Sequence, residues 1–408
     1  MTEEKPTTSD ASPPPPPPTS ALTRGLEPAG RPAWIHGIAA VIFLYLFVSS
    51  IKVMGGGLKD VGDGSTWLQD IFSFGNNPII ALMAGVIVTA VVQSSSFTTA
   101  MIITLCGSGQ MDVETAIYAV MGANIGTSIT SIIVSLGNIK FRKQFRRGFT
   151  AAMAHTAINW LTVAVLFPIE WISNVVTGKG AILRFSEWVS TSINLSGDIE
   201  NPFNPIKWAT HPVTWIFDAV TSWLGNPVTQ GVVVAIMGLV LLFFSLYYLV
   251  ASLKGALLSR LEGLFRSFFF RNDAIAFVVG VIATVLVQSS SVTTSLIVPL
   301  ASAGAVRLRR IFPFLLGCNI GTTVTGVIAA AASMTPDAIT VATAHIAFNV
   351  FGTVIWYPLR AMPISLARTY GRLASKSKRN AITILVVLFL VIPSVGIVVT
   401  EIVTAIIK

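Results

Sequence analysis

The sequence predicts an all-α polytopic membrane protein made of two inverted repeats, each with a re-entrant helical hairpin and a broken transmembrane helix. Three observations predict this fold class: an apolar composition, a set of membrane-length apolar segments, and a pair of polar motifs that occurs twice at one spacing. The 408 residues are 53% hydrophobic and 11% charged, whereas soluble domains carry about 25% charged residues. A mean hydropathy of +0.74 is typical of a chain whose solvent is lipid.

The charge pattern supports a membrane location and argues against a nucleic-acid partner. The net charge is +9, but the basic residues cluster in short runs between apolar segments, as the positive-inside rule describes. Cys106 and Cys318 lie far apart with no CxxC pair, so neither a disulfide framework nor a zinc site is expected. The chain has no GxxxxGK[ST] phosphate loop, which excludes ATP hydrolysis of the P-loop type as its energy source.

The apolar segments divide the chain into five parts. Seven segments reach the roughly 20 residues that span a bilayer; they are 34–53, 112–136, 148–168, 228–252, 311–333, 339–359 and 382–404. The predicted parts are a disordered cytoplasmic tail (1–33), a first repeat (34–168), an extracytoplasmic connecting loop (169–227), a second repeat (228–359), and a basic cytoplasmic loop with the last transmembrane helix (360–408). The tail contains six consecutive prolines and cannot bury enough apolar surface to fold.

Two further apolar stretches, 74–106 and 269–304, are interrupted at their centres by Gln-Ser-Ser-Ser. Each is too polar in the middle for a plain spanning helix, and each suits a re-entrant hairpin. Irregular backbone at membrane depth is tolerated only where it is buried in protein or lines a cavity.

The interruptions belong to an internal repeat. Residues 93–99 (Gln-Ser-Ser-Ser-Phe-Thr-Thr) match residues 288–294, and residues 122–127 (Gly-Ala-Asn-Ile-Gly-Thr) match residues 317–322, both at an offset of 195. Between 93–128 and the segment 195 residues later, 14 of 36 positions are identical. Two polar motifs at one offset indicate a duplication, which is the building plan of many secondary transporters.

The charges around the second motif orient the two copies. In the first copy the segment follows Asp112 and Glu114 and precedes a basic run at 140–147, whereas in the second copy it follows a basic run at 307–310. Since Lys and Arg favour the cytoplasmic side, the copies run in opposite directions and the N-terminus lies inside. Inverted repeats are the arrangement behind alternating access.

The membrane-embedded motifs offer hydroxyls, amides and glycines but no charged residue. Sodium is a hard cation that prefers oxygen ligands, as calcium and magnesium do. Glycines beside Asn124 and Asn319 are expected to let the helix unwind and free backbone carbonyls, and the resulting half-helix N-termini suit an anion. The composition therefore favours sodium together with an oxyanion, without saying which oxyanion, because a proton-coupled carrier more often carries an intramembrane carboxylate.

The doubled Gln-Ser-Ser-Ser motif, each copy followed about 25 residues later by Gly-x-Asn-Ile-Gly-Thr, resembles the type II sodium-dependent phosphate cotransporters over roughly residues 70–360. The short central loop without cysteine resembles a bacterial member. The resemblance implies sodium-coupled uptake of inorganic phosphate. It implies substrate-binding residues in the motifs, namely Ser94, Ser95, Ser96, Thr98, Thr99, Ser289, Ser290, Ser291, Thr293 and Thr294. It also implies sodium sites at Gln93, Ser95, Asn124, Thr127, Gln288, Ser290, Asn319 and Thr322.

The resemblance further implies a multi-pass protein of the bacterial inner membrane, with sodium as the co-transported ion and no organic cofactor. Phosphate, sodium and the lipid bilayer are the expected partners, nucleic acid is not, and a homo-oligomer stays open. His155 with Asn159, and His345 with Asn349, are interpreted as pairs that tie helices together, and Gly85 and Gly280 as close-packing positions.

Three alternatives remain. The first is a sodium-coupled carrier of another oxyanion, such as sulfate or a dicarboxylate. The second is a membrane-embedded serine enzyme, although no Gly-x-Ser-x-Gly elbow is present and the protein is not expected to be an enzyme. The third is a passive channel, in which polar rings face a continuous pore.

Overall fold

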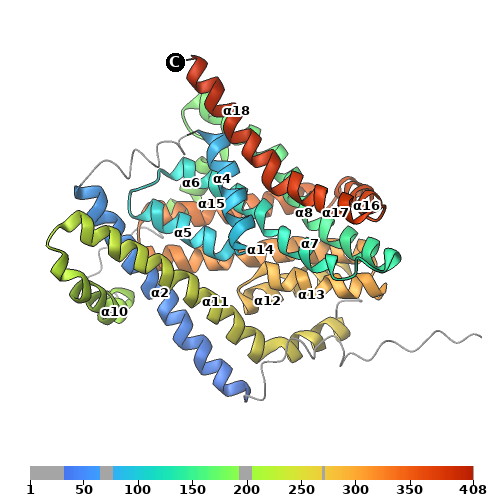
Figure 1. Cartoon of the computed structure of the whole chain (residues 1–408), viewed down its shortest axis with the longest axis horizontal. Helices are drawn as coiled ribbons and strands as arrows, with labels where there is room; N and C mark the ends of the chain where they lie inside the picture. Colours follow the sequence, from blue (N-terminus) through green and yellow to red (C-terminus); the bar gives the residue numbers. More distant parts are fainter. Residues whose placement is uncertain (1–31, 65–76, 193–204, 269–271, 408) are drawn as a thin grey trace, which may run out of the picture.

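The computed structural model describes residues 32–64, 77–192, 205–268 and 272–407, which form a helical assembly with no strand among these residues (Figure 1). Residues 1–31 of the predicted tail lie outside the described residues. The helices up to the centre of the chain are α2 (Ala33–Gly64), α4 (Pro78–Val92), α5 (Ser95–Gly107), α6 (Val113–Thr127), α7 (Ile129–Leu136), α8 (Arg142–Thr177), α9 (Ala181–Ser192), α10 (Pro205–Thr221) and the 3₁₀ turn η2 (Ser222–Leu224). The helices that follow are α11 (Pro227–Phe268), α12 (Asp273–Val287), α13 (Ser290–Ala303), α14 (Leu308–Ser333), α15 (Pro336–Trp356), α16 (Ala361–Ala374), α17 (Lys378–Val386), the π-helical turn η3 (Val387–Val391) and α18 (Ile392–Ile407).

The seven predicted spanning segments correspond to seven helical stretches of the described chain that are long and apolar enough to cross a membrane. The observed ends differ from the predicted limits; the segment predicted at 148–168, for example, lies within the longer helix Arg142–Thr177, whereas the one predicted at 339–359 is observed at Pro336–Trp356. The last stretch, Lys378–Ile406, is the most apolar, and side chains such as Val395, Val399 and Ile402 are about half exposed. Exposed apolar side chains on a spanning helix suit a lipid environment.

Both predicted hairpins are pairs of short helices. α4 is followed by α5, and α12 by α13, with an interruption of two residues at Gln93-Ser94 and Gln288-Ser289. Each helix of these pairs has 13 to 15 residues, fewer than the roughly 20 that span a bilayer. Whether each pair enters and leaves on one side stays a prediction.

The two copies repeat the same close helix contact. A Cβ atom on Gly85 of α4 would overlap the carbonyl oxygen of Ala119 in α6, and a Cβ atom on Gly280 of α12 would overlap the carbonyl oxygen of Phe314 in α14. Gly122 and Gly317 make the reciprocal approach to the backbone of α4 and α12. Small residues allow membrane helices to approach at backbone distance, so these glycines fix the α4–α6 and α12–α14 pairs.

This packing corrects one expectation. The backbone beside Asn124 and Asn319 was expected to unwind, but Asn124 lies within α6 and Asn319 within the continuous helix α14. The first-copy helix is instead interrupted at Ser128, between α6 and α7. The glycines beside Asn124 and Asn319 allow close contact between helices. The irregular backbone that both copies share lies instead at the glutamine of each Gln-Ser-Ser-Ser motif.

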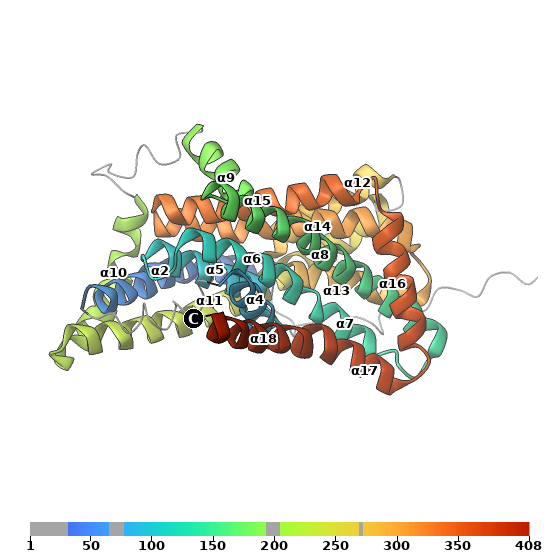
Figure 2. The ribbon, with the colours of Figure 1, turned by 90° about the horizontal axis from the view of Figure 1, so that it is seen from above.

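The copies interlock. α5 of the first copy packs on α14 and α15, while α13 of the second copy packs on α7 and α8. α2 and α11 run side by side along one flank (Figures 1 and 2). Two apolar clusters result: one around Val86, Phe149 and Phe312, and one around Phe47 and Ile103. The motif breaks therefore lie within a packed assembly built by both copies.

The predicted connecting loop, 169–227, contains helices where the structure describes it, namely the end of α8, then α9 and α10. The buried carboxylate of Glu170 accepts hydrogen bonds from the backbone amides of Ile182 and Leu183 in the first turn of α9. A carboxylate at a helix N-terminus satisfies amides that have no partner within the helix. The side of the membrane on which this segment lies stays a prediction.

Candidate functional site

The glutamine of each Gln-Ser-Ser-Ser motif holds a left-handed backbone conformation. Gln93 has φ 57° and Gln288 has φ 56°, a conformation that costs a non-glycine residue about 1–2 kcal/mol. Met334 is the other such non-glycine residue in the described chain. Each glutamine ends one helix by donating its backbone amide to the threonine four residues earlier, at 2.8 Å from Thr89 O and from Thr284 O.

The serine after each glutamine starts the next helix. Ser94 Oγ accepts from Phe97 N and Ser289 Oγ accepts from Val292 N, both at 3.3 Å. Serine is a favoured N-cap because its hydroxyl accepts a bond from an amide of the first turn. Each motif thus encodes a helix stop and a helix start in adjacent residues, and the same geometry appears in both copies.

The two motifs are in direct contact although they lie far apart in the sequence. Ser96 Oγ donates to the backbone carbonyl of Gln288 at 3.0 Å, and Ser291 Oγ lies 3.5 Å from the carbonyl oxygen of Thr127. Thr325 Oγ1 donates to Gln288 Oε1 at 3.0 Å. The polar groups of both copies therefore lie together and are treated as one candidate site.

The helix ends give this site both signs of partial charge. The C-terminal ends of α4 and α12, at Gln93 and Gln288, present carbonyl groups, and the N-terminal ends of α5 and α13 present amides. A helix C-terminus carries about −0.5 and an N-terminus about +0.5 elementary charge. Such a pair of ends can hold a cation and an anion close together without any charged side chain.

Most of the predicted substrate-binding side chains are buried. Ser95, Ser96, Thr98, Thr99, Ser290, Ser291, Thr293 and Thr294 are at most 5% exposed. Thr98 and Thr293 donate to the carbonyls of Ser94 and Ser289. Thr99 Oγ1 and Ser290 Oγ are buried without a hydrogen-bond partner among the described residues. Buried polar groups are usually paired, so these two hydroxyls are candidates for contact with a transported ion.

The predicted sodium residues fall into two environments. Thr127 and Thr322 both donate to the carbonyl four residues earlier, at 2.9 Å, which leaves their oxygen lone pairs able to accept or coordinate. Asn319 is held by other side chains: His155 Nε2 lies 2.7 Å from Asn319 Oδ1, and Asn319 Nδ2 donates to Asn159 Oδ1 at 2.7 Å. Asn159 Nδ2 in turn donates to the carbonyl of Asn124 at 2.6 Å.

These bonds support the interpretation of His155 and Asn159 as residues that tie helices together, because they join α8 to α6 and α14. The second pair differs. Asn349 donates to the carbonyl of His345 on its own helix, and both ring nitrogens of His345 are buried without a partner in the described chain. The hydrogen bonds of the two copies are thus asymmetric.

Thr325 was missed by the sequence reasoning. It lies one helical turn after Thr322, on the same face of α14, and that spacing could have identified it. Its counterpart at offset 195 is Thr130, whose hydroxyl is buried without a partner among the described residues. The copies therefore also differ here, since Gln288 is bonded to Thr325 while the side chain of Gln93 is exposed.

The two pairs of motifs carry no charged side chain. Among the described residues, no group of three or more His, Cys, Asp or Glu side chains could hold a metal ion. Any cation bound between the motifs would be held by neutral oxygens from hydroxyls, amides and carbonyls, which hard cations accept.

The chain is similar in sequence to known transport proteins. The sequence family described as Na+/Pi-cotransporter matches residues 46–190 and 222–375. "Sodium-dependent phosphate transport protein 2A" of Mus musculus is 33% identical in an alignment 421 residues long, gaps included, and the alignment covers 86% of this chain and 66% of that protein. "Sodium-dependent phosphate transport protein 2B" of Homo sapiens is 29% identical in an alignment 450 residues long, gaps included, and the alignment covers 88% of this chain and 65% of that protein. The chain thus spans about two thirds of the length of these relatives, and no solved structure matches it significantly.

Proposed function

Because the chain belongs to the Na+/Pi-cotransporter family, we propose that it couples the inward movement of sodium to the uptake of inorganic phosphate by alternating access. The observation that carries the proposal is the pair of helix breaks at Gln93 and Gln288, where carbonyl ends and amide ends meet in one site. The names of the mouse and human relatives, which describe sodium-dependent phosphate transport, support the choice of ion and substrate.

Phosphate would bind at the N-terminal turns of α5 and α13. Amides of a helix N-terminus and serine hydroxyls are donors that suit phosphate oxygens. Ser95 and Ser290 begin these helices and are buried, and Ser290 Oγ has no partner among the described residues. A phosphate ion that accepts hydrogen bonds from the N-terminal amides of α5 and α13 would also accept one from the hydroxyl of Ser95 and one from the hydroxyl of Ser290.

Sodium would bind at the oxygens gathered around Gln288. The hydroxyl of Ser96 is bonded to the backbone carbonyl of Gln288, and the hydroxyl of Thr325 to the side-chain oxygen of Gln288. The two hydroxyls also lie within hydrogen-bond distance of each other. A sodium ion could take the place of the hydrogen bonds in this cluster: the hydroxyls would keep their protons and turn them away, and the oxygen lone pairs would coordinate the ion. The cation and the anion would then offset each other, and the site needs no buried charged side chain.

The direction of coupling rests on the proposed inverted topology. The basic runs at 140–147 and 307–310, at opposite ends of corresponding helices, support this topology because Lys and Arg favour the cytoplasmic side. Two copies that pack on each other and differ in their hydrogen bonds suit a cycle in which they exchange roles. A multi-pass location in a bacterial inner membrane, with the N-terminus inside, completes the proposal.

The test is uptake of radiolabelled phosphate into proteoliposomes with and without an inward sodium gradient. The proposal requires saturable uptake that depends on sodium and is not supported by potassium. Sulfate and a dicarboxylate are offered in parallel. Transport of sulfate or the dicarboxylate in place of phosphate would contradict the assignment of phosphate as the substrate. Uptake that rises linearly with phosphate concentration and does not depend on sodium would indicate a channel.

A further inference from the structure

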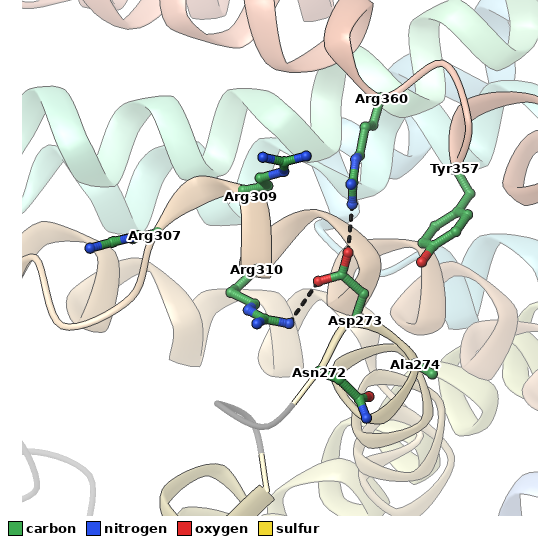
Figure 3. Close-up of a pocket in the computed structure, with 8 residues that line it drawn as sticks. All are labelled: Asn272, Asp273, Ala274, Arg307, Arg309, Arg310, Tyr357 and Arg360. Atoms are coloured by element: carbon green, nitrogen blue, oxygen red, sulfur yellow. Dashed lines mark hydrogen bonds and ion pairs between the residues drawn. The ribbon is translucent and has the colours of Figure 1, made fainter.

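A second polar feature lies away from the motif site. A cavity of about 610 Å³ opens between the beginning of α12, the beginning of α14 and the segment after α15 (Figure 3). Its charged lining consists of Asp273, Arg307, Arg309, Arg310 and Arg360. Four guanidinium groups and one carboxylate give the lining a net charge of +3.

The carboxylate organises only two of the four arginines. Arg310 Nη1 lies 2.9 Å from Asp273 Oδ1, and Arg360 Nη1 pairs with Asp273 Oδ2. Arg307 and Arg309 are exposed and form no ion pair with an acid of the described chain. Figure 3 shows Arg307 extending away from Asp273. Two fixed and two unpaired guanidinium groups around one hollow suit an anion with several acceptor oxygens, because guanidinium matches phosphate geometry.

The first copy shows that the fold does not require these arginines. At offset 195 from Arg307 and Arg309 stand Asp112 and Glu114. Asp112 caps α6 by accepting from Thr115 N at 2.8 Å, whereas α14 begins after Arg307 with no side-chain cap bond. The same position of the repeat thus carries acids in one copy and arginines in the other, and the uncapped amides of α14 add positive partial charge to the cavity.

The cavity lies at the expected level of the lipid headgroups. The membrane-length helices Leu308–Ser333 and Pro336–Trp356 respectively begin and end beside it. Tyr357 follows directly, and the guanidinium of Arg360 lies over its ring at 5.8 Å from the centroid. Tyrosine is enriched at the membrane–water boundary, and basic residues at that level attract anionic lipids.

We propose that this cavity binds the phosphate group of an anionic phospholipid, with Arg307 and Arg309 as the principal contacts. Free phosphate shares this chemistry, but the position at the edge of two spanning helices favours a ligand held by the bilayer. Basic residues at membrane edges also act as topology signals; that role requires charge alone, whereas a binding site requires these two arginines in this cavity.

The experiment is native mass spectrometry of the full-length protein titrated with phosphatidylglycerol and, separately, with phosphatidylcholine. We expect tighter binding of phosphatidylglycerol by about tenfold or more, given the attraction of each basic residue for anionic lipid. The variant R307Q/R309Q should lose this preference. The matched control R368Q/R379Q removes the same charge from exposed arginines of α16 and α17 and should retain it.

Two results would overturn the proposal: an equal loss in both double variants, or no preference in the wild type. A third titration adds inorganic phosphate alone. If R307Q/R309Q abolishes the binding of inorganic phosphate, and the wild type does not prefer phosphatidylglycerol over phosphatidylcholine, then the cavity binds free phosphate and the lipid assignment is wrong. If the double variant does not fold, the single variant R309Q, at an exposed side chain, provides the same comparison. None of these measurements requires transport, so their outcome is separate from that of the uptake experiment.

Discussion

His155 Nε2 lies 2.7 Å from Asn319 Oδ1, and this buried hydrogen bond joins α8 of the first copy to α14 of the second. With the Asn319 amide oriented toward Asn159, the acceptor is an oxygen, and Nε2 carries the proton. The corresponding His345 has no such bond in the described chain. The copies thus share a backbone plan but differ in the bond that crosses between them.

The first prediction concerns the free energy of unfolding. His155→Ala leaves the buried Asn319 oxygen without its donor, so we expect a loss of about 1–3 kcal/mol. Asn319→Ala should cost a similar amount. The double variant should lose less than the sum, with a coupling energy of about 0.6–1.7 kcal/mol, as measured for hydrogen bonds between membrane helices. Unfolding titrations of the four proteins in detergent micelles measure this cycle.

A control cycle pairs His155→Ala with Ser245→Ala, because Ser245 is a buried serine of α11 that donates to Leu242 on its own helix. That pair should be additive, since the two sites share no partner. Additivity for His155 and Asn319 as well would mean that their contact contributes no stability.

Much of the backbone plan was predictable because its signals are local. A doubled Gln-Ser-Ser-Ser in an apolar segment predicts a break, since four polar residues are costly in lipid, and both breaks lie at the predicted glutamines. The unwinding at Asn124 and Asn319 was predicted wrongly from the flanking glycines. A glycine pattern fits either an unwound helix or a close helix contact, and only the tertiary packing decides between them.

The second prediction tests this packing role. A methyl group on Gly122 or Gly317 would overlap the backbone of the facing helix, so Gly122→Ala and Gly317→Ala should each destabilise the protein by about 1–3 kcal/mol. The matched control is Gly56→Ala in α2, where a Cβ atom would meet nothing within 4 Å. It should be neutral or slightly stabilising because alanine favours the helix. Equal unfolding midpoints for all three variants would argue against close packing as the reason for these glycines.

The side-chain site was less predictable than the backbone. The repeated motif identified Gln288 and Ser96 as candidate site residues. Their contact, like the hydrogen bond from Thr325 to Gln288, depends on how α5 of one copy packs on α14 of the other. Sequence periodicity places residues on a helix face; it does not say which face of a neighbouring helix they meet.

The third prediction concerns Thr325, which belongs to the proposed sodium cluster. Thr325→Val keeps the shape and removes the hydroxyl that donates to Gln288. Loss of one ligand oxygen, worth about 1–1.5 kcal/mol, should raise the sodium concentration for half-maximal uptake by about tenfold. Thr340→Val, at a threonine that donates only to Pro336 within α15, is the control and should leave it unchanged. An unchanged sodium dependence in Thr325→Val would remove this residue from the cation site.

The fourth prediction concerns Ser290 as a phosphate contact. Its buried hydroxyl has no partner among the described residues, so Ser290→Ala should leave the free energy of unfolding nearly unchanged. The KM for phosphate should rise by about tenfold with the loss of one hydrogen bond to a charged ligand. Ser245→Ala in α11 is the matched buried serine. A normal KM at equal protein density would contradict the assignment of Ser290 to the substrate.

The fifth prediction concerns the orientation of the repeats. Both native cysteines, Cys106 and Cys318, are buried, so a membrane-impermeant thiol reagent added outside intact cells should leave the wild type unlabelled. Lys143→Cys and Lys179→Cys stand at exposed positions at the start of α8 and just after its end. If α8 crosses outward from a basic cytoplasmic end, only Lys179→Cys should react from outside. Arg368→Cys, in the basic segment of the second half, should stay unlabelled until the cells are permeabilised. Labelling of Lys143→Cys or Arg368→Cys in intact cells would place those basic segments outside, and the inverted arrangement on which the direction of coupling rests would have to be abandoned.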